Sequence, residues 1–187
     1  MVGSSVGIRP LAPEDAEAVA ALQNRLWRLT YTGLVPDDVL DSRDDAANTR
    51  AWQERATAQV ATGRSGEGAV TLVAHDEAGT PVGWASTGPP RDVDAPTDTE
   101  LWSLYVAVEH QGSGVAARLL EAALPSSSAH LWVLAGNDRA IAFYRKVGYD
   151  LDGVTKHDPR LGAEELRMVR WADPPGAGAY TEGCRRG

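Results

Sequence analysis

Cysteine is almost absent from this chain, because Cys184 is the only one among its 187 residues. A single cysteine excludes an internal disulfide, and no histidine-containing ordered segment lies near it, so we interpret it as incidental rather than as a catalytic thiol. Histidine is also sparse, at positions 75, 110, 130 and 157. These isolated positions show no metal-ligand spacing, and the sequence therefore predicts no metal site.

Long apolar runs are missing as well. No stretch of 18 or more apolar residues occurs, so no membrane-spanning helix is expected. Residues 1–7 lack the basic start and apolar core of a signal peptide, which favours a cytoplasmic protein. Basic residues are outnumbered and the net charge is −8. This charge disfavours nucleic acid, which needs a basic surface, and weakly favours a cationic partner.

The patterns that are present predict one α/β domain. We assign it to residues 1–171 and expect residues 172–187, rich in Gly, Pro and Arg, to form a flexible tail. Apolar periodicity predicts helices over residues 12–30, 46–61, 115–124 and 138–147, with a short helix near Pro36. β-Rich runs predict strands over residues 6–11, 69–75, 82–87, 98–108, 129–134, 149–156 and 164–171. Hairpins combined with two crossover helices indicate a mixed sheet between helices.

A glycine turn, Gln111-Gly-Ser-Gly114, joins the predicted strand 98–108 to the helix that follows. The first amides of a helix have no internal partner and carry a partial positive charge, so a pyrophosphate fits there. Gly112 and Gly114 let the backbone approach such a ligand. Residues 112–117 also match a dinucleotide fingerprint, but three residues separate it from its strand, and no acid lies about 20 positions on. A turn without a ligand is the remaining alternative.

Two motifs in order resemble one family. Residues 111–116, Gln-Gly-Ser-Gly-Val-Ala, match the Q/R-x-x-G-x-G/A signature of the GNAT superfamily of N-acetyltransferases. Residues 137–149 resemble the family's second block, N-x-x-A-x-x-F-Y-x-x-x-G-F/Y, and residues 104–106 resemble the splayed strand before the signature. On this basis residues 6–171 are identified as a member. The resemblance implies an α/β GNAT fold, with a mixed central sheet of about seven strands, helices on both faces and a splayed strand pair at the acetyl-CoA site.

The resemblance also implies the reaction and its residues. A primary amine attacks acetyl-CoA directly, through a tetrahedral intermediate whose oxygen accepts the Val106 N–H. Tyr144, with an unperturbed pKa of about 10, protonates the leaving thiolate. Asn137 caps its helix, with or without a contact to CoA. The predicted cofactor-binding residues are Leu104, Tyr105, Val106, Gln111, Gly112, Ser113, Gly114, Val115, Ala116, Ala117, Asn137 and Tyr144.

Glu100 is the predicted general base. It lies six residues before Val106 on one strand, so the two side chains should face the same side. GNAT members that acetylate lysine often carry a glutamate at this offset. The alternative is a solvated residue at the start of the strand, and Asp98, Asp158 and Glu164 are weaker candidates for the base.

The acceptor site is the least readable part of the sequence. Aromatic walls can hold a cation, which suggests Trp27, Tyr31, Trp84 and Trp102, with Leu34 and Tyr105 beside them. The helical spacing of Trp27 equally suits a plain core residue. The loop 157–162 is expected to close over the substrate, and the loop 88–97 narrows the site.

These features favour a small-molecule amine as acceptor. The alternatives are a protein N-terminus or lysine and, from another class, a non-catalytic acyl-CoA-binding regulatory domain. The resemblance also allows a homodimer, although no residue indicates one.

Overall fold

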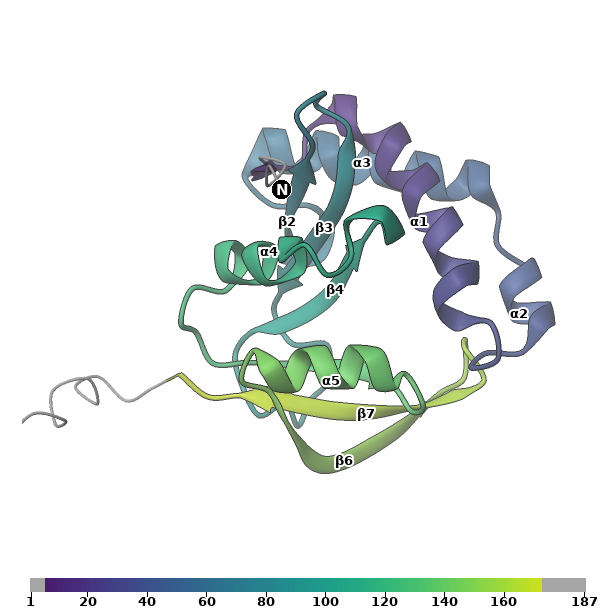
Figure 1. The fold of residues 1–187 in the computed structure, drawn as a ribbon, viewed down its shortest axis with the longest axis vertical. Coiled ribbons are helices and arrows are strands. Elements are labelled where there is room, and N and C mark those ends of the chain that lie inside the picture. Colours follow the sequence, from purple (N-terminus) through teal and green to yellow (C-terminus); the bar gives the residue numbers. More distant parts are fainter. Residues whose placement is uncertain (1–5, 173–187) are drawn as a thin grey trace, which may run out of the picture.

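The computed structural model describes residues 6–172 (Figure 1). All but the first residue of the predicted tail 172–187 therefore lies outside the described residues, as does Cys184. Seven strands form one sheet: β1 (Gly7–Pro10), β2 (Val70–His75), β3 (Pro81–Gly88), β4 (Glu100–Val106), β5 (Ala129–Leu134), β6 (Asp150–Asp158) and β7 (Ala163–Arg170). The order is β1-β2-β3-β4-β5-β7-β6, and β4–β5 is the parallel pair among antiparallel neighbours. The predicted mixed sheet is confirmed.

Five α-helices accompany the sheet: α1 (Ala16–Tyr31), α2 (Asp37–Asp41), α3 (Asp45–Thr62), α4 (Val115–Ala123) and α5 (Asp138–Lys146). Single 3₁₀ turns occupy Pro13–Asp15, Gly66–Gly68 and Val108–His110. The bounds of α3 follow from local chemistry: Asp44 caps the first turn by accepting the amide of Ala47, and Gly63 ends the helix at φ 76°. No helix among residues 6–172 is long and apolar enough to cross a membrane, and the cytoplasmic location stays a prediction.

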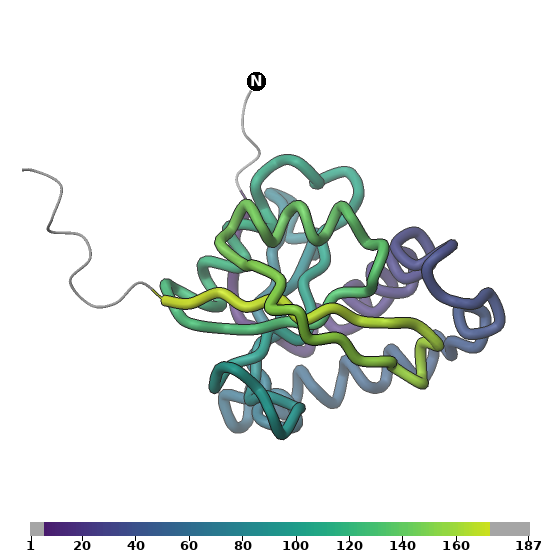
Figure 2. The backbone as a smooth tube through the Cα atoms, turned by 90° about the horizontal axis from the view of Figure 1, so that it is seen from below, coloured from purple at the N-terminus to yellow at the C-terminus, as the bar shows by residue number. Residues whose placement is uncertain are grey.

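Helices cover both faces of the sheet, as expected (Figures 1 and 2). A Cβ on Gly83 of β3 would lie 3.3 Å from Leu119 of α4. The next residue, Trp84, packs edge-on against Trp52 of α3, with ring centroids 5.4 Å apart. Because successive strand residues point to opposite faces, α4 and α3 lie on opposite sides.

The pairing of β3 with β4 contains a register shift that the sequence did not predict. Val106 lies opposite Gly83, and Glu100 lies opposite Gly88. The segment 100–106 of β4 is therefore one residue longer than the segment 83–88 of β3 with which it pairs. The side chains of directly opposed residues lie on the same face of the sheet. Gly83 and Gly88 are an odd number of residues apart on β3, so these two positions face opposite sides. The side chains of Glu100 and Val106 therefore point to opposite faces, and the expectation that they share one is wrong.

The parallel pair β4–β5 splits open soon after it forms. The two strands pair at Glu100↔His130 and Leu101↔Leu131, and the paired register ends there. From Trp102 onward β4 diverges from β5. The expected splayed strand pair is confirmed, and residues 102–106 border the opening.

Candidate active site

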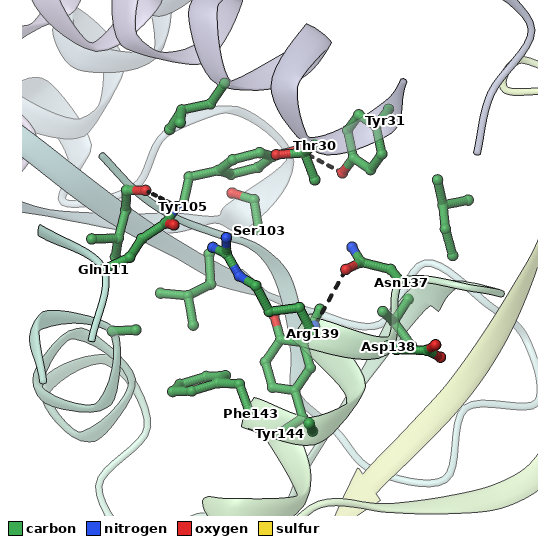
Figure 3. Close-up of a pocket in the computed structure, with 18 of the residues that line it drawn as sticks. Thr30, Tyr31, Ser103, Tyr105, Gln111, Asn137, Asp138, Arg139, Phe143 and Tyr144 are labelled. Carbon is green, nitrogen blue, oxygen red and sulfur yellow. Dashed lines mark hydrogen bonds between the residues drawn. The ribbon is translucent and has the colours of Figure 1, made fainter. Parts of the chain in front are cut away.

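A cavity of about 1370 Å³ lies at the split between β4 and β5 (Figure 3). It is bounded by the end of α1, the glycine turn, the end of β5 and the first two turns of α5. Typical pockets for small ligands measure about 300–1,000 Å³. The cavity is therefore large enough for a long cofactor arm together with a second substrate.

The backbone of β4 directs free hydrogen-bonding groups into the split. The amide of Ala107 donates to Val82 of the β3 side at 2.8 Å. Because peptide groups alternate along a strand, the N–H groups of Leu104 and Val106 point the other way, toward the diverged β5. The Val106 carbonyl accepts a hydrogen bond from Gln111 Nε2 at 3.1 Å, which ties the glycine turn to the strand end. The Val106 amide therefore points into the split, and its role in stabilising an oxyanion stays a prediction.

The N-terminus of α4 borders the cavity without a side-chain cap. Gly114 is its N-cap at φ 88°, with no side-chain cap, and Gly112 has φ 77°. A Cβ on either glycine would meet no atom within 4 Å, so these positions need glycine for their conformation rather than for room. The first amides of α4 remain available to a phosphate group.

Two predicted cofactor residues do not reach the cavity wall. The hydroxyl of Ser113 donates to the His110 carbonyl, and Val115 is a buried core residue. The other predicted members line the cavity: Leu104, Tyr105, Val106, Gln111, Gly112, Gly114, Ala116, Ala117, Asn137 and Tyr144. Their contact with a cofactor stays a prediction.

Asn137 performs the predicted capping role. Its side-chain oxygen accepts the amide of Ala140 at 3.2 Å, and the residue also lines the cavity (Figure 3). The cap fixes the start of α5 and leaves one side of the amide group facing the cavity.

Tyr144 of α5 is buried, with its ring at the cavity wall below Asn137 (Figure 3). Burial raises the pKa of its hydroxyl well above the ordinary value, and the neighbouring Tyr31 and Tyr149 raise it further. The expected unperturbed pKa is therefore wrong. The hydroxyl stays protonated across the physiological range, so it can donate a hydrogen bond, although the raised pKa makes it a weaker acid than an unperturbed tyrosine.

The predicted acceptor aromatics form a chain, and only part of it faces the cavity. Trp84 is fully buried and stacks on Tyr105 with ring centroids 4.7 Å apart. The Tyr105 hydroxyl bonds that of Tyr31 at 2.7 Å (Figure 3). Trp27 packs edge-on against Tyr31. Tyr31, Tyr105, Trp102 and Leu34 line the cavity, whereas Trp27 and Trp84 support it from behind.

Both hydroxyls of the tyrosine pair are neutral. Burial raises the pKa of Tyr31, and it raises that of Tyr105 well above the ordinary value. They therefore present a polar but uncharged part of the wall.

Glu100, the predicted base, lies behind the wall. It is completely buried, so the alternative of a solvated strand residue is wrong. Its carboxylate accepts the backbone amide of Arg91 at 2.9 Å and also binds that residue's guanidinium. Glu100 does not line the cavity, and neither do Asp98, Asp158 and Glu164. Its role as base stays a prediction that this geometry does not favour.

Three distant residues gather behind the same wall. Ligand atoms of Asp92, Glu100 and His130 lie within 4.8 Å of one another. Sequence spacing missed this group because it comes from a loop and two strands. Arg91 binds the Glu100 carboxylate, and Lys156 lies 3.1 Å from that of Asp92. The protein's own cations thus already neutralise the cluster.

Trp132 and Glu165 are among the residues of the cavity wall that sequence reasoning missed. Glu165 follows Glu164, and which of the two faces inward depends on a strand register that the sequence does not encode locally. The loop 157–162 contributes Leu161 to the wall. It packs against the segment after α1, where a Cβ on Gly162 would lie 3.5 Å from Pro36.

Comparisons with known proteins agree with this geometry. Residues 24–149 match the profile of the Acetyltransferase (GNAT) family. The chain is 31% identical over 158 residues to a probable N-acetyltransferase of Mycobacterium tuberculosis, covering 83% of this chain and 86% of the relative. It is also 31% identical over 135 residues to an L-methionine sulfoximine/L-methionine sulfone acetyltransferase of Pseudomonas aeruginosa, covering 69% of this chain and 70% of the relative.

Among solved structures, the PaiA N-acetyltransferase of Thermoplasma acidophilum in complex with coenzyme A shares the fold. Its TM-score is 0.67 at 19% identity, over 89% of this chain and 99% of that one. Together with the motifs at the split sheet, these matches show that the chain belongs to the GNAT family of acetyl-CoA-dependent N-acetyltransferases.

Proposed function

We propose that this enzyme transfers the acetyl group of acetyl-CoA to the primary amine of a small molecule. The observation that carries the proposal is one continuous cavity. It joins the split between β4 and β5, and the open N-terminus of α4, to a compartment at the end of α1. Two substrates can therefore meet beside the Val106 amide.

Each part of the cavity suits one part of acetyl-CoA. The α4 amides after Gly114 offer donors and a partial positive charge to the pyrophosphate. The inward amides of Leu104 and Val106 offer strand-like hydrogen bonds to the pantetheine arm. This arrangement brings the thioester to the buried hydroxyl of Tyr144.

The residues then divide the chemistry between them. The Val106 N–H stabilises the carbonyl oxygen as the amine nitrogen bonds to the carbonyl carbon. The carbon–sulfur bond breaks, and the leaving sulfur takes a proton from Tyr144. The nitrogen loses one proton to a base or water, and Tyr144 regains one from solvent. The products are the amide and CoA with a free thiol.

A small acceptor is favoured over a peptide because apolar side chains from three segments pack together at the far end of the compartment. Leu161 of the β6–β7 turn packs with Leu34 against a buried cluster of Val35, Leu40 and Leu134. A peptide would need an open groove at this point. The relative from Pseudomonas aeruginosa, named for two methionine derivatives, supports the same choice.

A turnover screen tests the proposal. Small primary amines, lysine-containing peptides and peptides with free N-termini are incubated with acetyl-CoA, and the released thiol is measured. We expect turnover with small amines and little with peptides. Preferential turnover of peptides would identify a protein acetyltransferase. Tight binding of acetyl-CoA without any turnover would identify the non-catalytic alternative.

A further inference from the structure

The compartment at the end of α1 carries one charged side chain. We call the acceptor compartment the part of the cavity lined by Tyr31, Leu34, Tyr105, Trp132, Leu161 and Glu165. Four other residues among the described cavity lining have an acidic or basic side chain: His110, Asp138, Arg139 and Lys146. His110 ends the 3₁₀ turn before the glycine turn, and the other three belong to α5, from which the Arg139 side chain points toward Ser103 and Tyr105 (Figure 3). Among the six residues that define the acceptor compartment, Glu165 is therefore the charged one.

The register of β7 turns Glu165 toward this compartment. Glu165 lies directly opposite Leu134 of β5, and two residues further Arg167 lies opposite Trp132. Opposed residues share a face, and Glu165 and Leu134 both line the cavity, together with Trp132 and Val133 at the end of β5. Glu164 points to the other face and is exposed.

The Glu165 carboxylate is largely buried, and the cation beside it is too far away for a hydrogen bond. Its side chain is 15% exposed, and its nearest cation, Lys156, lies 3.9 Å away, beyond hydrogen-bond distance. Lys156 is engaged elsewhere, 3.1 and 3.3 Å from the two carboxylate oxygens of Asp92. Burial raises the pKa of Glu165, although the charge of Lys156 opposes the shift. A buried carboxylate of this kind gains most from a ligand that brings its own charged donors.

We propose that Glu165 binds the ammonium group of the acceptor, and that the acceptor is a primary amine on an apolar or aromatic body. This inference rests on the proposed function. The aromatic and leucine side chains of the compartment suit the body.

The same residue can prepare the amine for attack. One N–H bond of the ammonium breaks and an O–H bond forms on the Glu165 carboxylate, which leaves the nitrogen lone pair free. A carboxyl group whose pKa is raised toward neutrality is a better proton acceptor than an ordinary glutamate.

Matched acceptors test the inference. Tryptamine and phenethylamine are compared with ethanolamine and 2-methoxyethylamine, which carry polar bodies, at saturating acetyl-CoA. We expect kcat/KM to be at least about tenfold higher for the two aromatic amines, because their rings bury apolar surface against the aromatic and leucine side chains of the compartment. The reverse preference would overturn the inference while leaving the acetyltransferase activity established.

Matched variants locate the effect. Glu165→Gln should lower kcat/KM for the amines by about 10- to 100-fold, the range expected for a hydrogen bond between charged groups. It should also remove the acidic limb of the pH–rate profile and leave the KM for acetyl-CoA unchanged. The neighbouring Glu164→Gln should change neither constant. Equal activity of both variants and the wild type would overturn the role of Glu165 alone, whereas no turnover of any amine by the wild type would overturn the proposed function as well.

Discussion

At the scale of single residues, two buried tyrosines allow a catalytic role to be tested against a packing role. They are Tyr144 of α5 and Tyr149, which follows that helix. Tyr144 lines the cavity and stays protonated because burial raises its pKa. Replacing Tyr144 by Phe removes the proton donor and keeps the ring. We expect kcat to fall by about 10²- to 10⁴-fold, with the dissociation constant of acetyl-CoA unchanged, as measured by thiol release and calorimetry.

Tyr149 supplies the control for this substitution. It is also fully buried, packs edge-on against Tyr144 and has a hydroxyl without a hydrogen-bond partner. It does not line the cavity. Tyr149→Phe should therefore keep the wild-type kcat and the wild-type stability or better. If Tyr144→Phe behaved in the same way, Tyr144 would be a packing residue only.

The direction of the Tyr144 shift also predicts the alkaline behaviour. A tyrosine whose pKa is raised loses its proton only above its ordinary value of about 10. The wild-type kcat should therefore show no decline between pH 7 and pH 10 that the Tyr144→Phe variant lacks. A decline centred below pH 10 in the wild type alone would mean that Tyr144 is solvated rather than buried.

Residue roles were predictable from the sequence where one local element fixes the geometry. Asn137 and Ala140 lie on one helical turn, so their cap could be deduced from spacing alone. Glu100 and Glu165 were not predictable, because their orientation depends on the pairing of separate strands. The register shift between β3 and β4 puts the Glu100 side chain on the face opposite to that of Val106. No motif in the sequence predicts this shift.

At the scale of elements, the glycine turn and α4 act as one anion-binding unit. Gly114→Ala adds a side chain at φ 88°, where the cost is strain and not collision. We expect a loss of about 1–2 kcal/mol in the free energy of unfolding. The shift of the first α4 amides should also weaken acetyl-CoA binding several-fold, which calorimetry measures.

Gly153 separates these two effects. It has φ 86° in β6, a Cβ there would meet no atom within 4 Å, and it does not line the cavity. Gly153→Ala should therefore cost similar stability and leave acetyl-CoA binding intact. Equal losses of affinity in both variants would show that Gly114 acts through stability and not through the α4 amides.

Element boundaries were predicted well where glycine, proline or caps mark them. The predicted helix 138–147 compares with the observed α5, Asp138–Lys146, between the Asn137 cap and Gly148. The strand predicted over residues 98–108 is shorter, Glu100–Val106, because Val108–His110 form a 3₁₀ turn. Its ends are decided by where its neighbours stop pairing, which is a property of the assembled sheet.

At the scale of the molecule, the loop between β3 and β4 connects the two halves of the split sheet. Asp92 accepts the Trp132 indole N–H and binds Lys156 of β6, and the carbonyl of Asp94 accepts Arg167 of β7. The sequence predicted this segment as a loop but gave no sign of these partners. They lie 40 to 73 residues away along the chain, and pairing over such separations appears only once the sheet is formed.

The Arg91–Glu100 pair offers a test of that connection. Glu100 is fully buried, and Arg91 is 44% exposed. Arg91→Ala leaves a buried carboxylate without its cation and should lower the free energy of unfolding by about 3 kcal/mol, the lower end for a broken buried pair, since water already reaches Arg91. Urea unfolding measures the change.

A surface ion pair provides the comparison. Arg25 and Glu109 join α1 to the Val108–His110 turn at 3.0 Å, with both side chains more than half exposed. Arg25→Ala should leave the free energy of unfolding almost unchanged, because solvent screens the pair and replaces its hydrogen bonds. If the two variants were equally stable, the buried carboxylate would be solvated in the absence of Arg91. The loop would then contribute little to holding β4 against the β5–β7–β6 half of the sheet, and the rigidity of the split at Val106 would have to come from the helices alone.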